Sequence, residues 1–112
     1  MICNCEADQT HVGIINNLDG KINLQVHCKS KDDDLGIHVI PYLGKYEFSF
    51  KYNLRDTTLF FCGFKWDANL HWFDIYSFNR DANVCQNDCM WNIQETGPCR
   101  VQGNSCYPWN NN

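Results

Sequence analysis

The stretch that decides the fold runs from Ile22 to Gly36 and reads INLQVHCKSKDDDLG. Its first half alternates: Ile22, Leu24, Val26 and Cys28 are separated by Asn23, Gln25, His27 and Lys29. Alternating apolar and polar residues with β-branched members are typical of a half-buried strand. Five of the six residues from Lys29 to Asp34 are then charged. We therefore expect a core strand with a thiol on its buried face, followed by a solvated loop.

Similar short runs recur along the chain and predict further strands. Turn signals separate them at intervals of about 8–12 residues, a spacing that is typical of an all-β sandwich. The segment 79–88 is polar and is expected to be a loop. The fold class expected is thus an antiparallel β-sandwich of about seven to eight short strands, stabilised by disulfides, with a small closed barrel as the alternative. The expected strands are 11–16, 22–29, 36–42, 46–52, 57–66, 71–78, 89–94 and 99–101.

Two details of the packing follow from these runs. Asp19-Gly20 suits a type I′ turn, which predicts that strands 11–16 and 22–29 form an antiparallel hairpin. The residues Tyr46, Phe48, Phe50 and Tyr52 share one face of a strand, which suits the core between two sheets. The inward faces of the other strands should carry Cys28, Cys62, Cys89, Phe73 and Ile75.

Length and charge limit the class of protein. A chain of 112 residues is long enough for one domain, 1–112, with polar tails at 1–10 and 102–112. The net charge of −4 disfavours nucleic acid as a partner. The sequence has no apolar run of the ~18 residues that membrane insertion needs. Because residues 1–5 lack the features of a signal peptide, we expect a mature form of a secreted precursor with an added initiator Met.

The cysteine content indicates an oxidising compartment. Eight cysteines in so short a chain favour disulfides over a zinc site, and the spacing of Cys85 and Cys89 supplies only half of one. Eight cysteines allow 105 connectivities. The inward strand faces favour Cys28 with Cys99 and Cys62 with Cys89, so that disulfides would fasten the two sheets together. The remaining cysteines, Cys3, Cys5, Cys85 and Cys106, would pair among themselves or stay free.

No pattern points to catalysis or to a cofactor. His27 and Cys28 are neighbours on a strand and face opposite sides, so they cannot act as a base and nucleophile together. The spacing of the four histidines does not bring two of them to one cleft. Asp32, Asp33 and Asp34 are contiguous, whereas calcium loops use alternate acids. We therefore expect no enzyme, no metal and no cofactor; a secreted hydrolase or toxin-like defence protein, or a structural wall protein, are the alternatives.

The stretch from His27 to Gly36 resembles the signature of the plant self-incompatibility S-protein homologues. Further matches follow in the same order and extend the resemblance from His11 to Trp109. Three cysteines, Cys3, Cys5 and Cys85, depart from the family pattern. The further matches are His11-Val12, Asn16-Asn17-Leu18, Tyr46-Glu47-Phe48-Ser49-Phe50, Thr58-Leu59-Phe60-Phe61-Cys62, Trp66, Phe73-Asp74-Ile75-Tyr76, Cys89-Met90-Trp91, Gly97-Pro98-Cys99 and Cys106-Tyr107-Pro108-Trp109.

This resemblance implies a function in recognition between plant cells. The founding members act in the pistil, where they cause rejection of self pollen through a pollen membrane receptor. By resemblance, this chain would be a secreted, monomeric signalling ligand that presents variable loops to a cell-surface receptor. The polar segments 29–34, 67–69 and 79–88 are the expected contacts, since loops on a rigid scaffold commonly carry recognition. The residues expected to touch the partner are Lys31, Asp32, Asp33, Asp34, Asp67, Asn69, Arg80 and Asp81.

Overall fold

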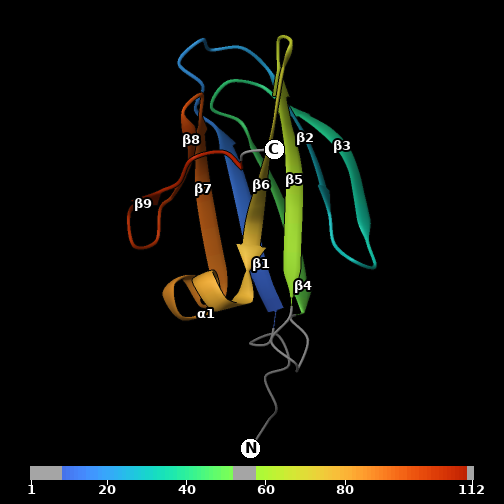
Figure 1. Cartoon of the computed structure of the whole chain (residues 1–112), viewed down its shortest axis with the longest axis vertical. Coiled ribbons are helices and arrows are strands. Elements are labelled where there is room, and N and C mark those ends of the chain that lie inside the picture. Colours follow the sequence, from blue (N-terminus) through green and yellow to red (C-terminus); the bar gives the residue numbers. More distant parts are fainter. Residues whose placement is uncertain (1–8, 52–57, 111–112) are drawn as a thin grey trace, which may run out of the picture.

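The protein is a sandwich of two β-sheets, as the alternating pattern predicted (Figure 1). The computed structural model describes residues 9–51 and 58–110. One sheet has five strands in the order β4-β1-β7-β8-β9, and the other has four in the order β3-β2-β5-β6. The strands are β1 (Gln9–Asn16), β2 (Leu24–Lys29), β3 (Asp34–Ile40), β4 (Lys45–Lys51), β5 (Leu59–Trp66), β6 (Asn69–Ser77), β7 (Asp88–Gln94), β8 (Gly97–Arg100) and β9 (Ser105–Cys106).

The predicted hairpin between the first two strands is wrong. Strand β1 pairs antiparallel with β4 and parallel with β7, and β2 lies in the other sheet. The connection from β1 to β2 crosses from one sheet to the other, and the complete burial of Leu18 in the core stabilises this path. The turn at Asp19 and Gly20 is instead held by Glu95, whose two carboxylate oxygens accept their backbone N–H groups at 2.8 and 3.0 Å.

A buried asparagine joins the two sheets where β1 ends. The Asn16 side chain is fully buried. Its Nδ2 donates to the carbonyl of Ile22 at 2.7 Å and to that of Ile40, in the opposite sheet, at 2.8 Å. Its Oδ1 accepts the backbone N–H of Leu18 at 3.1 Å. Because unpaired polar groups in the core are costly, this side chain fixes how β1 and β3 meet.

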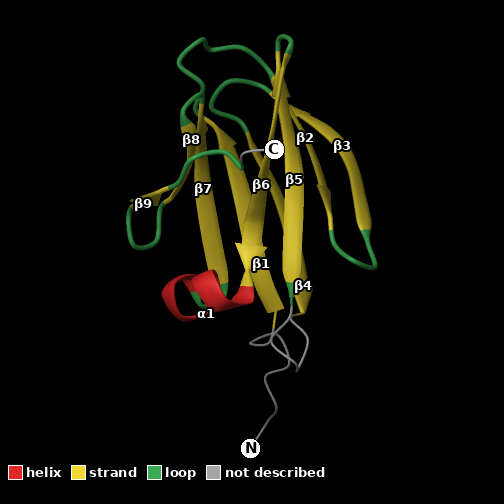
Figure 2. Ribbon diagram, in the orientation of Figure 1, coloured by secondary structure: helices red, strands yellow, loops and turns green. Residues whose placement is uncertain are grey.

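The segment expected to be a loop at 79–88 is largely a helix, α1, which spans Phe78–Cys85. Figure 2 shows it at one end of the sandwich, between β6 and β7. Eight residues are too few for a clear 3.6-residue period, which is why the pattern missed it. The helix start is held by Asp81, whose Oδ2 accepts the N–H of Ser77 at 2.9 Å. Among the described residues, no helix is long and apolar enough to cross a membrane.

The three disulfides of the described residues each lie within one sheet or one local segment. Their pairs are Cys28–Cys62, Cys85–Cys89 and Cys99–Cys106. The predicted pairs, Cys28 with Cys99 and Cys62 with Cys89, are therefore wrong, and so is the idea that these bonds fasten the sheets together. The physical reason is register: Cys28 lies directly opposite Cys62 on β2 and β5, and Cys99 opposite Cys106 on β8 and β9. Cys3 and Cys5 lie outside the described residues.

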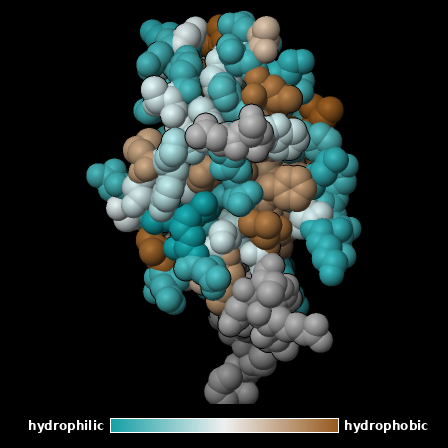
Figure 3. Space-filling model, viewed as in Figure 1, coloured by the Kyte–Doolittle hydropathy of each residue, from teal (hydrophilic) through white to brown (hydrophobic). Residues whose placement is uncertain are grey.

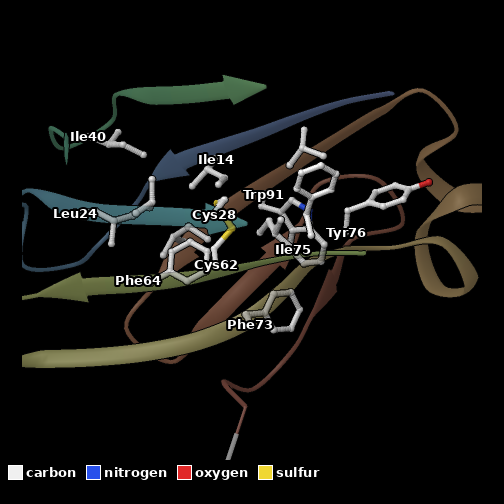
Figure 4. Close-up of a cluster of buried hydrophobic side chains, with 14 of the residues drawn as sticks. Ile14, Leu24, Cys28, Ile40, Cys62, Phe64, Phe73, Ile75, Tyr76 and Trp91 are labelled. Carbon is white, nitrogen blue, oxygen red and sulfur yellow. A yellow bond between two sulfur atoms is a disulfide. The ribbon is translucent and has the colours of Figure 1, made fainter. Parts of the chain in front are cut away.

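Packing of apolar side chains, rather than disulfides, holds the two sheets together. As predicted, Cys28, Cys62 and Cys89 are buried, and Figure 4 shows the Cys28–Cys62 bond among the side chains of this core. Phe73 and Ile75 are also buried, at 4% and 0% exposure. Each large apolar side chain buried in this way contributes about 1.5–3 kcal/mol.

The aromatic face of β4 packs on this core. The rings of Phe48 and Phe50 lie 5.1 and 4.6 Å from that of Phe60 in the opposite sheet. Phe50 also meets Tyr76 edge-on at 4.9 Å. Such contacts add about 0.5–1.5 kcal/mol each to the burial of the rings. The predicted fourth aromatic residue, Tyr52, lies outside the described residues.

Candidate functional site

The segments predicted to contact a partner lie at opposite ends of the sandwich (Figure 1). Lys29 pairs with Phe61 near the start of β5, and Leu59 pairs with Ser77 at the end of β6. The β2–β3 turn and helix α1 therefore share one end. The β5–β6 turn lies at the other end, beyond the pair Trp66–Asn69. These segments cannot form one continuous contact surface.

The β2–β3 turn presents its charged side chains to solvent. Lys31, Asp32 and Asp33 are exposed. The backbone is closed by Ser30, whose N–H donates to the carbonyl of Asp33 at 2.8 Å and whose Oγ accepts the N–H of Asp33 at 3.1 Å. The turn is thus a rigid acidic projection, and its side chains are free to meet a partner.

Asp34 belongs to the scaffold of this turn. Its Oδ1 accepts the N–H of Gly36 at 2.9 Å and lies 2.7 Å from Nε2 of His27. The hydrogen bond from Gly36 is the main cause that holds the pKa of the Asp34 carboxyl below its ordinary value, and the bond with His27 adds to it. The carboxylate therefore helps to set the geometry in which its neighbours Asp32 and Asp33 are displayed.

The β5–β6 turn is tight, with two residues between the paired strands. Asp67 and Ala68 form the turn, and Asp67 has a positive φ of 52°. Aspartate tolerates this conformation, which two-residue hairpins require. Asn69 already belongs to β6, where it pairs with Trp66. Asp67 and Asn69 are both exposed, at the far end from the acidic turn.

Arg80 and Asp81 do not lie in an open loop. Asp81 is completely buried within the fold, so it offers no surface to a partner. Its carboxylate accepts hydrogen bonds of 2.7–2.8 Å from the guanidinium of Arg80 and of 2.7 Å from that of Arg100. One buried carboxylate is thus the shared counter-charge of two guanidinium groups, and removal of this carboxylate would leave both without it.

Three aromatic rings surround the Arg80 guanidinium. Its central carbon lies 4.9 Å from the ring of Phe73, 5.0 Å from that of Trp91 and 5.2 Å from that of Tyr107. Attraction between a cation and ring faces adds to the ion pairs in such a site. We name this group the arginine cluster; it consists of Arg80, Asp81, Arg100, Phe73, Trp91 and Tyr107. Sequence reasoning missed it, because its members come from α1, β6, β7, β8 and the C-terminal segment.

The four histidines each have a different partner. His11 Nδ1 is hydrogen-bonded to Ser49 Oγ on the five-stranded sheet, and His27 contacts Asp34 on the other. The ring of His38 stacks on Tyr46, and that of His71 stacks on both Trp66 and Trp109. This arrangement does not bring two histidines to one reaction centre. Within residues 9–51 and 58–110, no three His, Cys, Asp or Glu side chains are grouped to hold a metal ion.

The outer face of the four-stranded sheet carries exposed hydrophobic side chains near both edges. Ile37 and Val39 of β3 are each 59% exposed; at the other edge, Leu70 is 55% and Trp72 39% exposed. The Trp72 ring packs over Gly63. A side chain at that position would place its Cβ 3.2 Å from Cζ3 of the ring. Figure 3 shows hydrophobic side chains among hydrophilic ones on the face that β5 and β6 present. The alternating sequence pattern predicted which side chains of this sheet are buried, but it did not predict that apolar side chains are exposed on the outer face.

Comparison with known proteins finds relatives that match nearly the whole chain. The family described as plant self-incompatibility protein S1 matches residues 11–109. S-protein homolog 5 of Arabidopsis thaliana is 51% identical over 94 residues, which make up 83% of this chain and 73% of that protein. S-protein homolog 19 of the same plant is 40% identical over 108 residues, or 96% of this chain and 81% of that protein.

The fold has a counterpart among solved structures. An SPH (Self-Incompatibility Protein Homologue) protein, from what is described as a widespread family of small, highly stable, secreted plant proteins, matches with a TM-score of 0.65. The match covers 93% of this chain and 96% of the other at 18% identity, so it shows a shared fold. The family match over residues 11–109 and the identity to the two Arabidopsis proteins show that the chain belongs to the plant self-incompatibility protein S1 family.

Proposed function

We propose that this protein is a secreted plant recognition ligand, of the self-incompatibility type, that binds a protein on the surface of another cell. The observation that carries the proposal is the family match from residue 11 to residue 109. The related SPH structure is described as that of a secreted plant protein, and three disulfides in the described residues suit an oxidising, extracellular compartment.

The architecture supports a role in binding rather than catalysis. The histidines have separate partners, and the most elaborate group of charged side chains, the arginine cluster, is built around a carboxylate with no exposure. The acidic β2–β3 turn, by contrast, exposes Lys31, Asp32 and Asp33 to solvent on a backbone that is closed by hydrogen bonds. Rigid display of polar side chains lowers the ordering cost of binding, which suits a ligand for a receptor. The ligand acts as a monomer in this proposal.

The test is a binding measurement on native membranes. The folded, fluorescently labelled protein is titrated onto plasma-membrane vesicles from plant tissue, before and after the vesicle surface is treated with protease. The proposal predicts saturable binding that protease removes. A non-saturable signal, or equal binding to vesicles made of plant lipids alone, contradicts it.

A second measurement separates this proposal from the hydrolase alternative. The same preparation is incubated with RNA, cell-wall glycans and a peptide mixture, and each is analysed for cleavage. We expect no cleavage above that of the heat-unfolded protein. Cleavage that disappears on replacing His11 or His27 with Ala would contradict a function in binding alone.

A further inference from the structure

The two sheets have four edge strands, and three of them are protected from pairing with another chain. Edge strands expose unpaired backbone groups, and natural proteins block them with charges, short length or covering segments. Strand β4 carries the exposed charged residues Lys45, Glu47 and Lys51. Strand β9 is only two residues long. Along β6, the C-terminal segment runs beside the strand, and the N–H of Asn110 donates to the carbonyl of Trp72 at 2.9 Å.

The fourth edge, β3, has no such protection in its second half from residues 9–51 and 58–110. Ile37 and Val39 point away from the core and are 59% exposed, with no charged residue between them and the end of the strand at Ile40. Strand β3 is the outermost strand of its sheet, paired on one side only with β2. A strand of this kind is an exposed apolar edge, which a secreted protein would be expected to block unless it is used.

The register shows which backbone groups face the open side. Cys28 and Cys62 lie opposite each other with their Cα atoms 4.0 Å apart, the short spacing of a pair that does not exchange hydrogen bonds. The backbone groups of Cys28 therefore point toward β3, and by alternation so do those of Val26. Val26 is opposite His38, so the backbone groups of His38 point back toward β2.

Ile37 and Val39 consequently direct their backbone N–H and C=O groups outward, away from β2. Two residues supply two donors and two acceptors along the free edge. The regular stretch begins after Gly36, where the pairing of β2 and β3 shifts register and φ is +80°. The available edge is thus short, running from Ile37 to Ile40, and has a defined hydrogen-bonding pattern.

We propose that this edge takes up an extended segment of the cell-surface partner, which would pair with β3 as a fifth strand of the four-stranded sheet. The inference rests on the proposed function, since it names the contact by which that partner is bound. Strand addition gives affinity through backbone hydrogen bonds and selectivity through alternate side chains.

The chemistry of the edge defines the segment that it fits. Residues of the added strand opposite Ile37 and Val39 project onto the same outer face, so apolar β-branched residues at alternate positions match them. The acidic turn with Asp32 and Asp33 lies just before the start of β3. A Lys or Arg at the corresponding end of the partner segment complements this charge and favours one direction of pairing.

The test compares three double variants in the titration on plasma-membrane vesicles. Ile37→Lys/Val39→Lys places charges on the edge, as β4 has naturally. Ile37→Val/Val39→Ile keeps the apolar, β-branched character at the same positions. Val84→Lys/Val101→Lys introduces the same charges at exposed apolar positions elsewhere on the surface. We expect the first variant to bind at least about tenfold more weakly than the wild type, and the other two to stay within about twofold.

A second readout separates strand addition from a contact between side chains only. Amide exchange is carried out on free and vesicle-bound protein, and single amides are located by fragmentation in the mass spectrometer. The proposal predicts that the N–H groups of Ile37 and Val39 exchange more slowly in the bound protein. Those of His38 and Ile40, which already bond to β2, should change little.

The outcomes are distinct. If the wild type shows no saturable, protease-sensitive binding, the proposed function fails and the strand-addition proposal fails with it. If the wild type binds and the lysine edge variant binds equally well, only strand addition is overturned. Weakened binding without slower exchange at Ile37 and Val39 also overturns it. A wild-type dimer in sedimentation that the edge variant abolishes would assign the edge to a second copy and overturn the assignment to a receptor segment.

Discussion

The two sides of the sandwich differ in how they are closed. On one side, the arginine cluster links the two sheets, since Arg80 contacts Phe73 of β6 and Trp91 of β7, and Arg100 of β8 contacts Tyr107 of the C-terminal segment. On the other side, β3 and β4 meet through the stacked rings of His38 and Tyr46, and no segment that the structure describes pairs with the outer edge of β3. The first side buries a charged cluster, whereas the second side has exposed apolar side chains on a strand that pairs with only one described neighbour. Under the strand-addition proposal, stability and recognition therefore depend on opposite sides of the sandwich.

The strongest way to break this division is to replace Asp81 with Asn. The change leaves the guanidinium groups of Arg80 and Arg100 without their shared counter-charge inside the fold. Loss of one partner from a buried ion pair costs about 3–5 kcal/mol in free energy of unfolding. Urea unfolding followed by tryptophan fluorescence measures it, with exposed Asp67→Asn as the matched control. A loss below about 1 kcal/mol would contradict the role assigned to the cluster.

Replacement of Asn16 with Ala tests the polar link near the open side. The variant loses the donors to Ile22 and Ile40 and leaves their carbonyls without these partners in the protein interior. We expect the free energy of unfolding to fall by about 2–3 kcal/mol, from the desolvation cost of the groups left unpaired. Asn92→Ala, on β7, serves as the comparison in the same urea experiment. Equal effects of the two changes would show that the link between the sheets is not special.

Arg80→Lys separates charge from shape within the arginine cluster. A lysine keeps the positive charge but lacks the planar guanidinium that lies among Phe73, Trp91 and Tyr107. Since arginine and lysine are not equivalent at stacked, multiply bonded sites, stability should fall by about 1–2 kcal/mol. The midpoint of thermal unfolding should drop accordingly. If the lysine variant unfolds with the wild type, the aromatic rings contribute only apolar contacts.

Ile37→Lys/Val39→Lys should leave stability nearly unchanged but weaken binding, unlike the changes in the arginine cluster and at Asn16. Both side chains face solvent, so the free energy of unfolding should change by no more than about 0.5 kcal/mol. The variant is therefore expected to unfold with the wild type in urea and yet to lose binding. A large loss of stability would show that the edge is part of the scaffold and would remove the contrast between the two sides.

The smallest effect concerns Asp34 and the acidic turn. Its pKa is lowered by the hydrogen bond from Gly36 and by His27, so its ionised form favours the folded state. That contribution is present above the ordinary aspartate pKa of about 4 and is lost as pH falls through the lowered value. Asp34→Asn should therefore weaken the dependence of stability on pH below about 4. Unfolding series at several acidic pH values provide the measurement, and an unchanged slope would contradict the assignment.

Local alternation predicted which way side chains face, but not which strands meet. The inward positions of Cys28, Cys62 and Phe73 followed from period two alone, because neighbouring side chains on a strand point to opposite sides. The partners of β1 did not follow, since its pairing with β4 and β7 joins segments far apart in the chain. The disulfide pairs failed for the same reason: they depend on strand register.

The candidate site was predicted only in part. Polarity identified Lys31, Asp32 and Asp33 as an exposed turn, and this is how they lie. Polarity also suggested an open loop at Arg80 and Asp81, where the fold instead forms a triad of charged side chains whose third member, Arg100, has no sequence signal. The open edge of β3 could not be inferred, because the exposure of Ile37 and Val39 depends on β3 being the last strand of its sheet.

The most direct test of the account is the ratio of vesicle affinities between Ile37→Lys/Val39→Lys and Val84→Lys/Val101→Lys. Both variants add the same charge at exposed apolar positions, and only the first alters the edge of β3. The account predicts that the edge variant binds about tenfold more weakly than its control. Equal affinities would show that recognition does not use this side of the sandwich.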